Sequence, residues 1–268
     1  MDARNLLFLL GTKKIVIYGT GYVAQKFFSI LKKNSLVGNI ICFAVSKGEK
    51  EGESIDGIAV KNIRDIESDN MVCIAVHEAL KDEMVDTLCD IGINNYIWIY
   101  PYLYQLLLGE PIEKGVRIKL EDIVQTCLND YRIAVRYAAI DNYYGKNIYG
   151  FDLYRRAQAL YSSMKTAEER LERFCKLISD WQKYGYDEDS WICINEGYEI
   201  IDGAHRVTLA KYHGMQEIIC NVFEGKASAY EVHGERVVLT NKILLQNGFS
   251  IEEIDKLNEI NNVIRFGK

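Results

Sequence analysis

A β-rich run that passes directly into a glycine turn and then a helix constrains this chain more than any other stretch. Residues 13–18 (KKIVIY) favour a strand, residues 19–24 (GTGYVA) form the turn, and residues 25–33 favour a helix. In the pattern Gly-x-Gly-x-x-Ala, the first glycine permits a tight turn, the second lets a ligand approach the backbone, and the alanine lets the helix pack on the strand. Free N–H groups at the start of such a helix attract phosphate. The turn therefore predicts cofactor-binding residues at Gly19, Gly21 and Ala24.

Strands continue to alternate with helices up to residue 100. Apolar runs at residues 40–45, 71–76 and 96–100 favour strands, and residues 79–91 favour a helix before the last of them. This alternation predicts the α/β class, with a doubly wound parallel, Rossmann-like sheet over residues 1–105. His77 follows the third strand, at the edge where such sheets bind ligands, so it joins the cofactor-binding candidates.

The end of the second strand leaves the ligand of this domain open. An NAD site usually has an acidic residue there, which binds the ribose hydroxyls. Here the strand ends at residues 45–47 (VSK), and Glu49 lies beyond it in a polar loop. Two interpretations follow: the domain holds a nicotinamide or sugar nucleotide, or it is a scaffold that binds no dinucleotide.

Residues 13–100 resemble the small Rossmann-like domain at the front of sugar-nucleotide N-acetyltransferases and several glycan-pathway proteins. The resemblance rests on the GTGYVA opening, on residues 55–60 (IDGIAV) after the second strand, and on residues 71–76. It implies a nucleotide or sugar-nucleotide ligand rather than hydride transfer.

The two prolines of the chain, Pro101 and Pro111, mark the end of this domain. Beyond them we expect a helical linker region over residues 106–150 and a second, α+β domain with added helices over residues 151–268. Apolar residues at helical spacing predict a helix from about residue 120, through Ile123, Cys127, Tyr131, Ala134 and Ala138. The other expected elements are a helix at 151–162, a helix opened by a capping box at 166–169 and closed by Gly185, hairpin strands at 191–195 and 198–201, a helix at 206–212, a strand at 217–223 and a last helix opened by a capping box at 250–253.

Residues 202–206 (DGAHR) form the strongest candidate site, because a strand delivers them directly into a helix. Gly203 can adopt a backbone conformation that a side chain would forbid. The helix start contributes partial positive charge, His205 can donate a hydrogen bond, and Arg206 offers a planar fork that matches phosphate oxygens. Each residue alone also has an ordinary structural explanation, with Asp202 as a helix cap and Arg206 as its salt-bridge partner. Together they predict an anion site, most simply for a nucleotide phosphate.

Residues 150–225 resemble the ParB/sulfiredoxin superfamily. The matching pattern is a hairpin (ICINEGYEII, residues 192–201), the sequence Asp-Gly-x-His-Arg, a short helix ending at Gly214, and the strand at 218–223. The resemblance implies a phosphate role for Gly203, His205 and Arg206. Sulfiredoxins carry a cysteine in this turn, where this chain has Ala204, so reductase chemistry is not expected. Partition proteins continue into a basic DNA-binding domain, whereas no basic cluster follows here.

A second arginine-containing segment precedes this turn, at residues 154–158 (YRRAQ). Consecutive helical residues point to different sides, so at most one of the two arginines can face a phosphate, and we take Arg155 as that candidate. A solvated helix face explains the segment equally well.

The favoured function is a phosphotransferase that uses ATP or ADP with Mg²⁺ to phosphorylate a small hydroxyl compound. Surface-glycan metabolism and secondary metabolism are the two settings considered for it. Asp202 or Glu199 would act as the catalytic base or hold Mg²⁺. The alternative is a non-catalytic protein that senses a nucleotide or sugar nucleotide in a glycan pathway. DNA binding is the third interpretation.

Charge and composition exclude some of these function classes. The net charge of −6 divides equally between residues 1–110 and the remainder, and neither half has the basic surface that DNA binding requires. The seven cysteines form no CxxC pair and none of the histidines has zinc spacing, so we expect free thiols, no metal-ligand set and a cytoplasmic protein. No apolar run reaches membrane-spanning length. A homo-oligomer is compatible with the composition.

Overall fold

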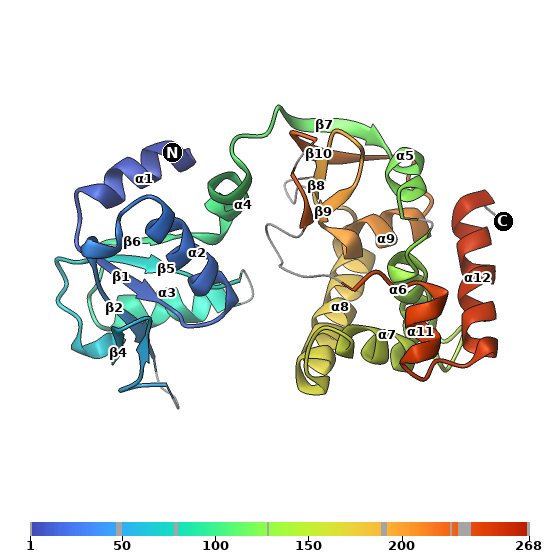
Figure 1. Cartoon of the computed structure of the whole chain (residues 1–268), viewed down its shortest axis with the longest axis horizontal. Coiled ribbons are helices and arrows are strands. Elements are labelled where there is room, and N and C mark those ends of the chain that lie inside the picture. The colour runs from blue at the N-terminus through green and yellow to red at the C-terminus, as the bar shows by residue number, and fades with distance from the viewer. Residues whose placement is uncertain are drawn as a thin grey trace. The chain divides into compact units, whose positions relative to one another are not determined.

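The computed structural model describes residues 2–46, 50–77, 80–127, 129–188, 192–225, 227–229 and 237–266. The chain folds into two compact units, residues 1–110 and 111–268. Figure 1 colours them from blue to green and from green to red. The division falls near the proline pair, five residues beyond the expected boundary at residue 105. Residues 111–150, expected as part of a linker, contribute a strand and two helices to the second unit.

The first unit is a parallel sheet with helices on both faces. Its elements are α1 (Ala3–Gly11), β1 (Ile15–Tyr18), α2 (Tyr22–Lys33), η1 (Val37–Asn39), β2 (Ile40–Val45), β3 (Ser54–Ile55), β4 (Ile58–Asn62), η2 (Ile63–Asp65), β5 (Met71–Ile74), α3 (Lys81–Asp90), β6 (Tyr96–Trp98) and α4 (Tyr100–Leu108). The strand order is β3-β4-β2-β1-β5-β6, and every pairing is parallel except β3 with β4. The expected α/β class with a mostly parallel sheet is confirmed for this unit.

Alternation along the strands explains the two apolar layers. Ile15 and Ile17 of β1 face one way and pack with α1, α2 and α4, whereas Val16 and Tyr18 face the other way and pack with α3 and η2. Both faces of β1 are fully buried, as expected for a strand at the centre of a parallel sheet.

The second unit combines a small mixed sheet with a set of helices. Its elements are β7 (Glu113–Lys119), α5 (Leu120–Gln125), α6 (Arg132–Tyr143), α7 (Gly150–Ala159), α8 (Met164–Tyr184), β8 (Ile192–Asn195), β9 (Ile200–Asp202), α9 (Ala204–Tyr212), β10 (Glu217–Phe223), α11 (Asn241–Gln246) and α12 (Ile251–Phe266). The strand order is β7-β10-β8-β9, in which β10 and β8 are parallel and the outer pairings are antiparallel. One apolar core joins this sheet to the helices.

Local sequence signals predicted most of these elements, with two corrections. The strand at 217–223, the Gly185 helix end and the capping box at Ser250 are confirmed. The predicted helix through residues 120–138 is wrong, because α5 and α6 are separate helices. Helix α8 begins earlier than predicted, since Ser163 rather than Thr166 caps it by accepting a hydrogen bond from the Thr166 N–H at 3.1 Å.

Candidate functional site

The turn between β9 and α9 has a backbone that requires glycine. Gly203 has φ +98° and ψ 16°, in the left-handed region. A Cβ at this position would lie 2.8 Å from Cγ1 of Ile192, on the neighbouring strand β8. Gly203, which precedes the first turn of α9, makes no side-chain capping bond to it. The helix therefore begins directly after the turn, and the N–H groups of its first turn give this end partial positive charge.

His205 points into the helical layer of the unit. Its Nε2 atom lies 2.7 Å from the hydroxyl of Tyr154 on α7, and its ring packs 4.5 Å from that of Phe174 on α8. Tyr154 is fully buried, and this burial raises its pKa to about 12. Because the phenol keeps its proton at neutral pH, it can donate to Nε2 when the ring proton of His205 is on Nδ1. The sequence analysis predicted no role for Tyr154, which is the first residue of the YRRAQ segment.

The environment of His205 is strongly positive. Burial is the main cause that lowers its pKa well below the ordinary value of 6.5, and the charges of four arginines lower it further: Arg136, Arg170, Arg206 and Arg173. His205 is therefore neutral at neutral pH, so it contributes a hydrogen-bonding group and no charge. Sequence reasoning identified only Arg206 of these four. The spacing of Arg170, Arg173 and Phe174 on one face of α8 was the available signal.

Asp202 and Arg206 form an ion pair across the turn, with Oδ2 and Nη2 3.0 Å apart. Both side chains are about three-quarters or more buried, and each makes further interactions. Asp202 lies opposite Cys193 of β8 in the sheet. The pair keeps the carboxylate and guanidinium at the turn, which is also the arrangement expected if Arg206 were purely structural.

Glu199 and Asp202 have different polar partners. It is exposed and lies in the hairpin before β9, where its carboxylate accepts a hydrogen bond from Asn195 Nδ2 at 3.0 Å. The Asn195 side chain in turn accepts from the Glu199 N–H at 3.0 Å. Glu199 precedes β9, whereas Asp202 is the last residue of that strand. The structure offers Asp202 as the carboxylate of the turn.

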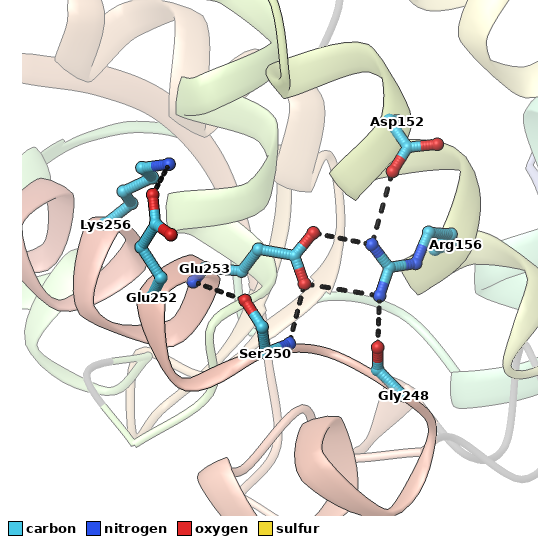
Figure 2. A network of polar contacts seen from close by, with 7 residues as sticks. All are labelled: Asp152, Arg156, Gly248, Ser250, Glu252, Glu253 and Lys256. Atoms are coloured by element: carbon cyan, nitrogen blue, oxygen red, sulfur yellow. Dashed lines mark hydrogen bonds and ion pairs between the residues drawn. The ribbon is translucent and has the colours of Figure 1, made fainter.

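The two arginines of the YRRAQ segment have carboxylate partners elsewhere. Arg155 pairs with Glu168 at the start of α8, with Nη2 and Oε1 3.3 Å apart. Arg156 points to the C-terminal helix, where Glu253 holds it with two hydrogen bonds (Figure 2). Arg155, the expected phosphate ligand, is therefore placed in a pair between α7 and α8 rather than with the four arginines around His205.

The glycine turn of the first unit closes on the neighbouring strand. Gly19 has φ +120°, and a Cβ there would lie 2.9 Å from the carbonyl oxygen of Ala75, just after β5. Gly21 begins α2 in an ordinary extended conformation, and a Cβ there would meet nothing within 4 Å. Ala24 is fully buried against the sheet. Gly19 is thus required by packing, whereas Gly21 leaves open space beside the helix start.

His77 lies near this turn in the fold but already has an aromatic partner. Its Nε2 atom and the hydroxyl of Tyr100 are 2.9 Å apart, and the two rings pack at 4.5 Å. At the end of β2 the hydroxyl of Ser46 bonds to that of Tyr18. The described residues do not include Lys47, Glu49 or Glu78. The first two follow β2, where an NAD site usually has the carboxylate that binds the ribose hydroxyls.

The thiols near the turn are protonated. Burial raises the pKa of both Cys193 and Cys220 to about 12. A thiol is nucleophilic only as its thiolate, so neither is an activated nucleophile. Among the residues that the structure describes, no group of three His, Cys, Asp or Glu side chains could hold a metal ion, and no helix is long and apolar enough to cross a membrane.

Comparison of the chain with protein-family models, curated proteins and solved structures found no match. What the chain does must therefore be inferred from the geometry of the turn and its neighbours.

Proposed function

We propose that the second unit binds a nucleotide phosphate at residues 203–206 and transfers a phosphoryl group to a small hydroxyl compound. The observation that carries the proposal is the left-handed turn at Gly203, which leads straight into α9 and places His205 and Arg206 on its first turn. A helix start, a neutral hydrogen-bonding ring and a guanidinium together form an anion-binding set. The succession β8–β9–α9–β10 also supports the ParB/sulfiredoxin-like interpretation of this unit.

Phosphoryl transfer suits such a site because it depends mainly on positioning and charge neutralisation. The bond between the terminal phosphorus of ATP or ADP and its bridging oxygen breaks, and a bond forms to the acceptor hydroxyl oxygen. Arg206 and the N–H groups of α9 would hold the phosphate oxygens, and Asp202 would accept the hydroxyl proton or hold Mg²⁺. A carboxylate oxygen is a ligand that Mg²⁺ prefers, and the bound ion would neutralise phosphate charge.

The test measures phosphorylated product from ATP and from ADP, with Mg²⁺, across a panel of small hydroxyl compounds. We expect turnover by the wild type and a loss of about a hundredfold in Arg206→Ala, because a charge-stabilising donor is removed. Arg117→Ala is the control, since it removes a surface arginine that is paired with Glu188. Lack of turnover by the wild type across the whole panel would contradict the proposal.

The open turn at Gly21 favours a second candidate, a nucleotide or sugar nucleotide held by the first unit. The bond between Ser46 and Tyr18 places hydroxyl groups at the end of β2, where an NAD site usually has a carboxylate. Stabilisation by sugar nucleotides but not by NAD, without turnover, would favour a regulatory protein of this kind over the phosphotransferase.

A further inference from the structure

Three arginines of the second unit, here called the helix arginines, gather around His205 from helices distant in sequence. They are Arg136 of α6 and Arg170 and Arg173 of α8. Phe174, next to Arg173, packs on the His205 ring, and α6 packs against α9. The charge of each helix arginine acts on both His205 and the Tyr154 hydroxyl that bonds to it. Their charges therefore act on one polar centre.

None of the helix arginines contacts a carboxylate within the described part of the chain. Arg170 has neutral partners: its Nη1 lies 3.1 Å from Gln158 Oε1 and 3.5 Å from Ser162 Oγ. Other arginines of these segments differ, since Arg132, Arg155 and Arg156 are all paired with Asp or Glu. Among the described residues, the three helix arginines thus act on His205 without a carboxylate partner of their own.

Arg136 differs from the other two helix arginines because it is buried. Its residue is 6% exposed, and its Nε–H has no hydrogen-bond partner. The bond that holds its guanidinium is donated by Nη1 to the Arg132 carbonyl at 2.8 Å. Burying a guanidinium without a counter-charge is costly, and a bound anion would remove that cost. A burial of this kind is expected where a ligand completes the site.

We propose that the helix arginines and His205 bind an anion that carries two or more phosphate groups, with Arg136 as its buried anchor. This deepens the proposed function and rests on it for the identity of the nucleotide. Three guanidiniums beside Arg206 exceed the charge of one phosphate monoester, whereas a diphosphate offers several oxygens to planar forks. The chemistry is that of a diphosphate group, whether free or part of a nucleotide or sugar nucleotide.

The test is a titration of the full chain with inorganic pyrophosphate and with inorganic phosphate, in EDTA, followed by calorimetry. We expect pyrophosphate to bind the wild type at least about tenfold more tightly than phosphate does. Arg173→Gln should weaken pyrophosphate binding about tenfold, and Arg136→Gln at least as much. Arg173 is exposed, so its replacement keeps the experiment decisive if the Arg136 variant does not fold.

Lys183→Gln is the matched control, because it removes one positive charge from an exposed position of the same helix. It lies ten residues beyond Arg173, about 15 Å along the helix by its rise per residue. Equal weakening by both variants, or no binding of pyrophosphate to the wild type, would overturn the inference. Titrations with ADP and a UDP-sugar then separate the sources of the diphosphate.

Different results would contradict the diphosphate site and the phosphotransferase. Pyrophosphate binding that depends on Arg173, without turnover of any hydroxyl compound, would leave the diphosphate site standing and remove the phosphotransferase. Turnover that is unaffected by Arg173→Gln, with no pyrophosphate binding, would do the reverse.

Discussion

A single backbone conformation at Gly203 controls the geometry of the candidate site. The left-handed φ turns the chain from β9 into α9, and the absence of a Cβ lets Ile192 pack against the turn. His205 and Arg206 take their directions from the helix that starts here. His205 then projects toward Tyr154, whereas Arg206 reaches back to Asp202. Gly203 therefore affects both the geometry of the candidate site and the packing of the unit.

Gly203→Ala should lower the free energy of unfolding by about 2–4 kcal/mol. The left-handed conformation costs a non-glycine residue roughly 1–2 kcal/mol, and the overlap with Ile192 adds to that. Gly214→Ala is the control, since Gly214 has φ +74° but its Cβ would meet nothing within 4 Å. Chemical denaturation should show a loss of about 1–2 kcal/mol for the control. Equal losses would mean that the contact with Ile192 is unimportant.

At the scale of elements, the start of α12 is connected to α7 by one carboxylate. Glu253 accepts from the Ser250 N–H at 2.7 Å, and its N–H donates to Ser250 Oγ at 3.1 Å, as a capping box requires. The same carboxylate accepts two hydrogen bonds from Arg156, which also donates to the Gly248 carbonyl (Figure 2). The cap of one helix is thus also the ion-pair partner of another.

Glu253→Gln should destabilise the protein by about 1–2 kcal/mol, because a partly buried, doubly bonded ion pair is lost. Burial opposes ionisation of Glu253, but the bonds from Arg156 and Ser250 hold its pKa below the ordinary 4.5. The unfolded chain therefore binds a proton more readily than the folded one. The stabilisation is complete above pH 4.5 and is lost as pH falls toward the lower folded pKa, so the difference between variant and wild type should shrink there.

Glu252→Gln is the matched control for this pair. Glu252 is 80% exposed and bonds only to Lys256 in the network drawn in Figure 2. Exposed pairs of this kind contribute little, so denaturation midpoints should change by the equivalent of about 0.5 kcal/mol or less. A loss in the control as large as in Glu253→Gln would show that general surface charge, rather than the α7–α12 connection, matters.

At the scale of the whole molecule, each unit has its own apolar core. The core of the second unit extends from Leu120 to Ile264 and includes the residues of α5 and α6 that were expected in a linker. β7 completes its sheet by pairing with β10, where Lys119 lies opposite Glu217. The division after Glu110 therefore separates two units that each bury their own apolar side chains.

A fragment of residues 111–268 should fold cooperatively and bind pyrophosphate, whereas a fragment of residues 151–268 should not fold. The shorter fragment lacks β7, so one edge of β10 would be unpaired. It also lacks α6, so it would lose core contacts and Arg136. Circular dichroism on heating and calorimetry would compare the two. Cooperative folding of the shorter fragment would contradict the assignment of β7 and α6 to this core.

The elements that the sequence predicted are those with strong local signals. The glycine turn at 19–24, the strand at 217–223 and the Ser250 capping box depend on neighbours within a few residues. β7 was missed because its polar residues alternate with only partly buried ones and its partner lies about a hundred residues away. The break between α5 and α6 was missed because the apolar spacing continues across it.

The sequence by itself identified the turn at 202–206, because a glycine, a histidine and an arginine between a strand and a helix are local features. Only the tertiary structure placed Arg136, Arg170 and Arg173 beside His205 and assigned Arg155 to Glu168. The physical reason is the range of the interactions involved. Backbone conformation follows from adjacent residues, whereas the electrostatic environment of a side chain is set by helices that meet only when the core has formed.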